Sequence, residues 1–352
     1  MNAIASNQRE GLLARLANGP VICAEGYLFE IERRGYLQAG AFVPEVVLEH
    51  PEVVKGLTRE FVHAGSDVAL AFTYYAHREK LRIIDREGDL EPINRQALAI
   101  AKDVAMETGA LFSGDLCNSN IYAPDDPAAE KAVRGMFEEQ ARWAGEAGVE
   151  MIVLETFSFA REALIGIEVC RQLGVPIVAT LAMHQPNQTR EGWTVGDACK
   201  RLQDAGAAVV GLNCIRGPDT MLSMLKEVRE SVSCPVAGLP VPYRTTAEQP
   251  SFQSLRDAHW HDFPNGRPFP TALDPFTCNR YEMAAFARDA FAIGVTYLGV
   301  CCGAGPHHIR AVAEALGRRP PASHYSADMS KHAFMGTDPR VSQVNREYVA
   351  KL

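Results

Sequence analysis

The sequence predicts an α/β fold, a (β/α)8 TIM barrel with a long insertion after the seventh strand and a C-terminal extension. Eight short β-rich runs alternate with longer helical patterns, and eight consecutive strand–helix units is the number that closes a parallel barrel. The alternative is an open doubly wound sheet, which often carries a Gly-rich phosphate turn after its first strand. No G-x-G-x-x-G motif is present here, and this favours the barrel.

The first four units place short apolar runs before helical repeats. A proline near the start of the first long helix supports its N-terminus, and apolar residues at three- and four-residue spacing mark the third. Strands are expected at residues 21–25, 67–74, 110–113 and 150–155, and helices at 44–63, 93–107, 127–147 and 160–173.

The last four units repeat this order. Gly174 separates the fourth helix from the fifth strand, as glycine often does at a helix end. Strands are expected at residues 176–182, 207–213, 235–239 and 295–300, and helices at 195–205, 219–232, 280–294 and 306–316.

Three segments do not fit the repeat: a charged stretch at 76–91, a proline-rich insertion at 241–278 and the C-terminal 320–352. The first two follow strands, so we expect them on the C-terminal face of the barrel, where barrel enzymes carry their chemistry. The predicted organisation is a barrel domain over 1–319. An extension over 320–352 is expected to pack near the active site or a subunit interface.

Composition bounds the class of protein. The 352 residues are 47% hydrophobic and 22% charged, with a net charge of −8, which is typical of a soluble globular chain and argues against nucleic-acid binding. No window of about 20 apolar residues predicts a membrane span, and no signal peptide is visible. Nine cysteines, an odd number in a large chain, favour a reducing, cytoplasmic location over a disulfide framework.

Three of these cysteines follow predicted strands. Cys214 ends the sixth, and Cys301 and Cys302 end the eighth, so a barrel brings all three to one face. Three thiolates suit Zn²⁺ and leave a fourth position for a substrate. Buried apolar cysteines or a redox pair are the alternatives. Glu25 and Glu155 end the first and fourth strands and could hold the ammonium group of an amino acid, or be salt-bridged.

The motifs Gly-Leu-Asn-Cys at 211–214 and Gly-Val-Cys-Cys-Gly at 299–303 resemble the zinc motifs of the homocysteine S-methyltransferase family. Residues 32–54, 60–66 and 306–311 look like its betaine–homocysteine branch. The resemblance covers most of 10–350. It implies that the three cysteines bind zinc, with the homocysteine sulfur as fourth ligand. It also implies that a betaine-type onium donor methylates homocysteine to methionine.

The resemblance also implies an acceptor site formed by Glu25, Gly26, Glu155 and Asn213. The family usually has aspartate in an Asp-Gly-Gly motif, where this chain has Glu25-Gly26-Tyr27. Gly26 is expected to let the substrate approach the backbone closely. Asn213 is expected to orient the zinc ligands or the substrate, or to stabilise a turn.

Aromatic faces bind onium groups well, and the expected donor site consists of Phe42, Tyr74, Tyr75, Thr156 and Phe157. The betaine enzymes have tryptophan where this chain has Phe42 and tyrosine where it has Thr156. Their donor-carboxylate residue aligns loosely with Gln343, with Arg340 or His332 as alternatives.

These departures leave several alternatives open. The donor could be a sulfonium such as dimethylsulfoniopropionate or S-methylmethionine, or a corrinoid or folate partner acting in trans. A non-catalytic zinc or redox sensor is a further alternative. A homodimer or higher homo-oligomer is expected.

Overall fold

The protein is described by a computed structural model that covers residues 10–184 and 187–352. Its centre is one parallel eight-stranded sheet in the order β1-β8-β7-β6-β5-β4-β3-β2. The strands are β1 Val21–Ala24, β2 Val68–Leu70, β3 Leu111–Cys117, β4 Met151–Phe157, β5 Ile177–Leu181, β6 Val209–Asn213, β7 Val236–Leu239 and β8 Val295–Val300.

A side chain joins the two end strands, β1 and β2, and so nearly closes the barrel. The Asp67 N–H donates to Ile22 O at 2.7 Å, and the Ile22 N–H donates to Asp67 Oδ2 at 2.8 Å. Arg318, after the last barrel helix, pairs with both oxygens of the Asp67 carboxylate at 2.6 and 2.7 Å. The predicted TIM barrel is therefore confirmed.

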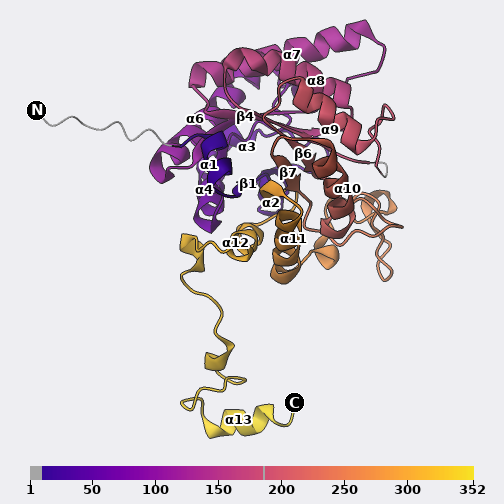
Figure 1. Ribbon diagram of the computed structural model, residues 1–352. Coiled ribbons are helices and arrows are strands. Elements are labelled where there is room, and N and C mark those ends of the chain that lie inside the picture. Colours follow the sequence, from indigo (N-terminus) through magenta and orange to yellow (C-terminus); the bar gives the residue numbers. More distant parts are fainter. Residues whose placement is uncertain (1–9, 185–186) are drawn as a thin grey trace, which may run out of the picture.

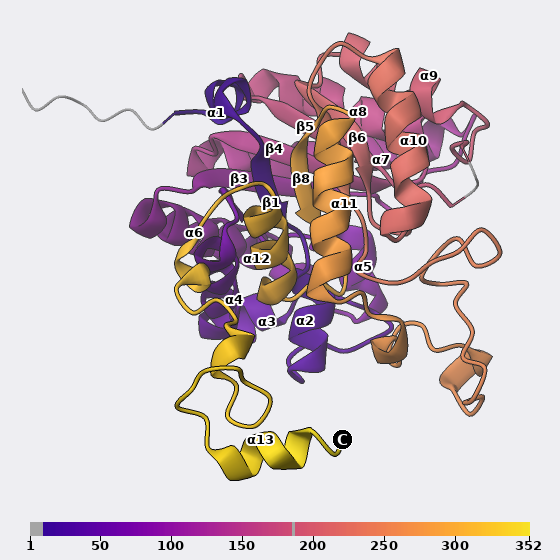
Figure 2. The ribbon, with the colours of Figure 1, turned by 60° about the horizontal axis from the view of Figure 1, so that its bottom comes forward.

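Helices surround the strands, as Figures 1 and 2 show. The barrel helices are α4 Pro51–Ala64, α6 Leu90–Thr108, α7 Pro127–Ala147, α8 Ala160–Cys170, α9 Val195–Asp204, α10 Pro218–Ser231, α11 Arg280–Ala292 and α12 Pro306–Ala315. Side-chain caps begin several of them: Asp126 accepts from two N–H groups at the start of α7, and Asn279 forms a capping box with Glu282 at the start of α11. Such caps pair N–H groups that have no partner within the helix.

The eight predicted strands and eight predicted barrel helices are all present, with ends that differ by a few residues. The predicted helix over 44–63 is divided into α3 Val46–Glu49 and α4, because the chain turns at His50 before Pro51. Four short helices were not predicted: α1 Leu12–Asn18, α2 Tyr27–Arg33, α5 Arg78–Ile83 and α13 Gln343–Val349. Within the described ranges, no helix is both long enough and apolar enough to cross a membrane.

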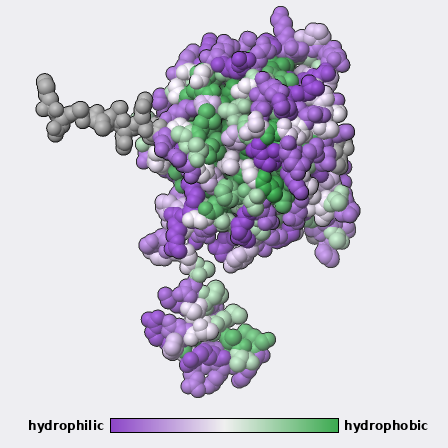
Figure 3. All heavy atoms as spheres, in the orientation of Figure 1, coloured by the Kyte–Doolittle hydropathy of each residue, from purple (hydrophilic) through white to green (hydrophobic). Residues whose placement is uncertain are grey.

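The C-terminal extension leaves the barrel after α12 and a short 3-10 turn at Pro321–Ser323. Figures 1 and 2 show it running away from the barrel and ending in α13. In Figure 3 it forms a separate lobe that a narrow neck joins to the barrel, and hydrophobic and hydrophilic residues are mixed on the surface of this lobe. Residues 320–325 still lie against α4 and α12, and in the described chain the remainder of the extension projects away from the barrel.

Candidate active site

The three predicted zinc cysteines converge at the C-terminal ends of β6 and β8. The Sγ atoms of Cys214, Cys301 and Cys302 all lie within 4.8 Å of one another. Those of Cys301 and Cys302 are 3.9 Å apart. Backbone hydrogen bonds fix the two turns: Cys214 N donates to Leu239 O and Cys301 N to Pro240 O, both at 2.9 Å. All three side chains are buried.

A glycine two or three residues before the first cysteine lets each strand pack closely. A Cβ atom on Gly211 would lie 2.0 Å from Ala237 O, and one on Gly299 would lie 1.9 Å from Cys23 O. Both contacts are far below van der Waals distance, so the two strands reach the cysteine turns only with glycine at these positions.

Three carboxylates lie buried next to the sulfurs. Glu25 follows β1, Glu155 lies in β4, and Asp115 in β3 was not anticipated from the sequence. Burial raises the pKa of Glu25 to about 8 and those of Glu155 and Asp115 well above their usual range. In the described chain, Glu25 Oε1 and Asp115 Oδ1 are buried without a hydrogen-bond partner. Unpaired buried acceptors are costly, so this cluster is suited to a cationic group with several N–H donors.

Asn213, at the end of β6, connects the carboxylates to the sulfurs. Its Nδ2 lies 3.0 Å from Glu25 Oε2, 2.9 Å from Glu155 Oε2 and 3.7 Å from Cys301 Sγ, and its Oδ1 accepts from Thr156 N at 2.9 Å. The side chain is fully buried. Asn213 therefore fixes the carboxylates of Glu25 and Glu155 relative to the sulfurs.

The thiols themselves differ in acidity. Hydrogen bonds from Cys301 and Cys302 hold the pKa of Cys214 well below its usual range. Burial raises the pKa of Cys301, and the hydrogen bond with Cys214 raises that of Cys302. Of the three thiols, Cys214 therefore has the lowest pKa.

A cavity of about 290 Å³ opens beside Cys214 and Cys302. Of the predicted donor residues, Phe42, Tyr74, Tyr75 and Thr156 line it. Tyr74 also faces a smaller cavity lined by Glu25, Asp115 and Glu155. One face of Tyr75 is already covered, because Lys80 Nζ lies 4.0 Å from the ring centroid.

Phe157 does not line the cavity, so its predicted donor role was wrong. The ring is fully buried and packs edge-on against Phe137 of α7 at 6.0 Å. The pairing of β4 with β5 shifts register between Leu154 and Phe157, and Thr156 has a φ of +65°. Such an irregularity reverses the side-chain alternation that follows it, which turns Phe157 toward the helices.

Gly26 also differs from expectation. A Cβ atom there would lie 2.4 Å from Ala304 O and 2.9 Å from Ala304 Cβ. The close approach at Gly26 is therefore to the loop after β8, which carries Cys301 and Cys302. Glycine at this position lets β1 and that loop pack together.

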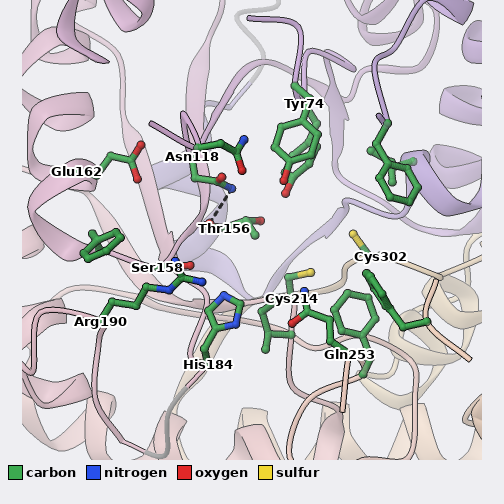
Figure 4. A pocket seen from close by; sticks show the side chains of 18 of the residues that line it. Tyr74, Asn118, Thr156, Ser158, Glu162, His184, Arg190, Cys214, Gln253 and Cys302 are labelled. Carbon is green, nitrogen blue, oxygen red and sulfur yellow. Dashed lines mark hydrogen bonds between the residues drawn. The ribbon is translucent and has the colours of Figure 1, made fainter. Parts of the chain in front are cut away.

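Much of the cavity wall was not predicted from the sequence. Figure 4 shows the pocket and labels several of the polar residues that line it. Those not predicted are Asn118, Ser158, Glu162, His184, Arg190 and Gln253, together with the rings of Phe29, Tyr122, Phe159, Phe252 and Phe269. Phe252, Gln253 and Phe269 come from the insertion after β7, which was expected on this face. Backbone strain also marks the site, because six of the nine non-glycine residues with positive φ in the described chain line the cavity.

None of the residues considered for the donor carboxylate on the extension reaches this cavity within the described chain. Gln343 bonds Glu347 in α13, and Arg340 pairs with Asp338 at 2.6 Å. His332 Nδ1 accepts from Phe334 N and Met335 N. All three belong to the lobe that projects away from the barrel (Figure 2).

Comparison with known proteins agrees with this geometry. Betaine–homocysteine S-methyltransferase 1 of Xenopus tropicalis is 35% identical over 354 residues, covering 98% of this chain and 86% of the relative. S-methylmethionine–homocysteine S-methyltransferase BHMT2 of Pongo abelii is 33% identical, covering 97% and 92%. The metallated homocysteine methyltransferase MmuM of Escherichia coli shares the fold, with a TM-score of 0.66 at 16% identity over 85% of this chain and 97% of that one. The family described as homocysteine S-methyltransferase matches residues 25–316, and the chain belongs to this family.

Proposed function

We propose that the protein transfers a methyl group from an onium donor, of the betaine type, to homocysteine and so forms methionine. One observation carries the proposal. Three thiols and a buried carboxylate cluster with unpartnered oxygens meet at one end of a cavity walled by aromatic rings. The named relatives use betaine or S-methylmethionine, so a sulfonium donor is the alternative.

The residues fit a zinc ion. Tetrahedral Zn–S bonds of about 2.3 Å place two sulfurs about 3.8 Å apart, and the Cys301 and Cys302 sulfurs are 3.9 Å apart. Cys214, Cys301 and Cys302 would hold the ion, which supplies a Lewis acid that keeps a bound thiol deprotonated at neutral pH.

The carboxylate cluster would bind the α-ammonium group of homocysteine. Glu25 Oε1 and Asp115 Oδ1 would accept its N–H donors, since both oxygens are buried and unpaired. Glu155 Oε2 stays bonded to Asn213 and adds charge. The positive charge of an ammonium group would stabilise the ionised carboxylates and so oppose the rise in pKa that burial causes. Binding of the ammonium group here would hold homocysteine with its sulfur toward the cysteines.

The aromatic walls would orient the donor and exclude water. Phe42 and Tyr74 line the cavity together with Cys302, and the faces of aromatic rings attract onium groups. The homocysteine sulfur forms the new S–CH₃ bond as the donor C–N or C–S bond breaks. The donor leaves as a neutral tertiary amine or thioether, so this transfer needs no general acid.

A donor screen tests the proposal. Zinc-loaded protein with homocysteine and glycine betaine, dimethylsulfoniopropionate or S-methylmethionine should yield methionine, measured by mass spectrometry. Cys302→Ala should lose zinc and at least a hundredfold in rate while its circular dichroism is kept. Cys170→Ala, at a buried cysteine of α8 remote from the cavity, is the matched control. Full activity of Cys302→Ala would rule out a three-thiolate site, and absence of methionine with every donor would refute the function.

A further inference from the structure

The main cavity has one permanently cationic side chain among its described lining residues, Arg190. Among the same lining residues, the one carboxyl group is that of Glu162 and the one imidazole is that of His184. Burial, and then the charge of Arg190, lower the pKa of His184, so that imidazole stays neutral. In Figure 4, Arg190 and Ser158 lie across the pocket from Cys302. A ligand whose methyl group faces the cysteines therefore extends its other end toward a positive charge.

Residues 188–194, which lead into α9, fix the position of Arg190. Its N–H donates to Ser158 O at 3.1 Å, and Thr189 N donates to Trp193 O at 2.9 Å. An isolated bridge pairs Gln188 with Thr194. These bonds tie the residue to the start of α8, so the backbone that carries the guanidinium is held in place before a ligand arrives.

The guanidinium is also available. Arg190 forms no ion pair with any described residue, and its side chain lies 5.6 Å from the centroid of the Phe159 ring. The nearby Glu162 carboxylate is engaged elsewhere, because its Oε1 accepts from Ser119 N at 2.7 Å and from Ser119 Oγ at 2.5 Å. A planar guanidinium without a partner matches a carboxylate through two parallel hydrogen bonds.

We propose that Arg190 binds a carboxylate at the end of the methyl donor remote from its onium group, and so selects onium acids over onium compounds that lack an acid group. This inference rests on the proposed function and adds the donor's chemical class to it. Ser158 and the His184 imidazole lie beside Arg190 on the same wall (Figure 4), where they can donate further hydrogen bonds. The anion would then be bound by the same subunit that carries the cysteines.

Binding and turnover together test the inference. Calorimetry would compare glycine betaine and dimethylsulfoniopropionate with tetramethylammonium, on zinc-loaded protein with methionine in the acceptor site. Wild type should bind at least one of the two acids roughly tenfold to a hundredfold more tightly than tetramethylammonium, as expected for a charged hydrogen-bonded pair. Arg190→Ala should abolish that preference, and Arg190→Lys should restore part of it. The KM for homocysteine should change less than twofold.

Two further variants make the result decisive. Arg161→Ala, at an exposed arginine of α8 that pairs with Asp125 and does not line the cavity, should keep the preference. Retention of the preference in Arg190→Ala, or its loss in Arg340→Ala instead, would overturn the proposal. Absence of any preference in wild type would do the same.

The two levels of inference can fail separately. An Arg190-dependent preference without methionine formation from any donor would refute the proposed function and leave the carboxylate site standing. Methionine formation with an unchanged preference in Arg190→Ala would refute only the carboxylate site.

Discussion

Asn213 uses both ends of its side-chain amide, and this decides what it can do. The sequence places it beside Cys214 and predicts that it orients the zinc ligands or the substrate, or stabilises a turn. The amide bonds two carboxylates, a backbone N–H and a side-chain hydroxyl. No free donor remains for a ligand, so Asn213 would act on the proposed homocysteine site through Glu25 and Glu155.

Asn213→Ala should therefore weaken both the fold and the binding of homocysteine. Unpaired buried groups cost about 1–3 kcal/mol, which urea unfolding would measure. The KM for homocysteine should rise at least tenfold, while zinc content is kept because the three thiols remain. Asn94→Ala is the control: it removes a buried amide bonded to Ala76 O and Leu90 O, so it should cost stability alone. Equal homocysteine KM values in the two variants would contradict the role of Asn213.

Glu162 should make the stability of the barrel depend on pH. Burial raises its pKa from 4.5 to about 7, so between these values the folded chain keeps a proton that the unfolded chain has lost. The contribution of Glu162 to the free energy of unfolding is therefore fully present below pH 4.5 and is lost as the pH rises through about 7. Glu162→Gln cannot ionise, and its amide oxygen can still accept from Ser119.

The free energy of unfolding of Glu162→Gln should therefore gain on that of wild type as pH rises from 5 to 7, by at most about 1.4 kcal/mol per pH unit. Denaturant titrations at several pH values would measure the difference. Glu168→Gln, at an exposed position on the same helix that pairs with Arg134, should show no such gain. Parallel curves for wild type and Glu162→Gln would contradict the assignment.

Among the secondary-structure elements, those with strong periodicity were predicted and the short ones were not. The strands ahead of Cys214 and Cys301 are continuous apolar runs, so their ends, and with them the cysteines, could be located. Helix α5 has only six residues, and the side chain of His77 caps its N-terminus by accepting from Lys80 N. Hydrophobic periodicity cannot reveal so short and charged a helix. This helix nevertheless matters for the cavity, because it places Lys80 over the ring of Tyr75.

The insertion after β7 forms a wall of the cavity through Phe252. Its side chain is 3% exposed and lies 4.9 Å from the ring of Phe269 and 5.9 Å from that of Phe29. Its N–H donates to Ile215 O at 3.0 Å. This ring thus joins the insertion to the turn that carries Cys214, a contact between distant segments that no local sequence pattern reports.

Phe252→Ala should loosen the insertion and enlarge the cavity. Removing a buried phenylalanine ring typically costs about 3–5 kcal/mol, and here that loss should appear as faster proteolysis within 241–278 and a donor KM raised at least fivefold. Phe286→Ala, at a buried position of α11 that does not line the cavity, should lower global stability without changing the donor KM. Unchanged cleavage and donor KM in Phe252→Ala would show that the ring does not hold the wall.

For the whole molecule, counting strand–helix units was enough to predict the barrel, because eight parallel strands have few ways to close. It also predicted that residues from β1, β4, β6 and β8 share one face. The bulge that turns Phe157 outward and the loop that carries Arg190 depend on contacts between neighbouring units. The position of the extension is a third feature that the sequence could not predict, because residues 320–352 have few contacts with the barrel that could specify it.

We propose that the extension contacts a second copy of this chain. Its apolar side chains are largely uncovered in one subunit: Tyr325 is 84% exposed, Met335 60%, Tyr348 60% and Leu352 85%. Apolar surface of this kind commonly marks an interaction site.

A chain ending at His324 would keep the Arg318–Asp67 ion pair and the bond from Ser323 to Glu314, so its barrel should unfold at the wild-type temperature. Light scattering should show a dimer or larger assembly for the full chain and a monomer for the shortened one. Because the cavity residues all precede 303, the monomer should keep its kcat. An unchanged mass after truncation would place the subunit contact on the barrel, and a lost kcat would mean that the extension completes the active site of its partner.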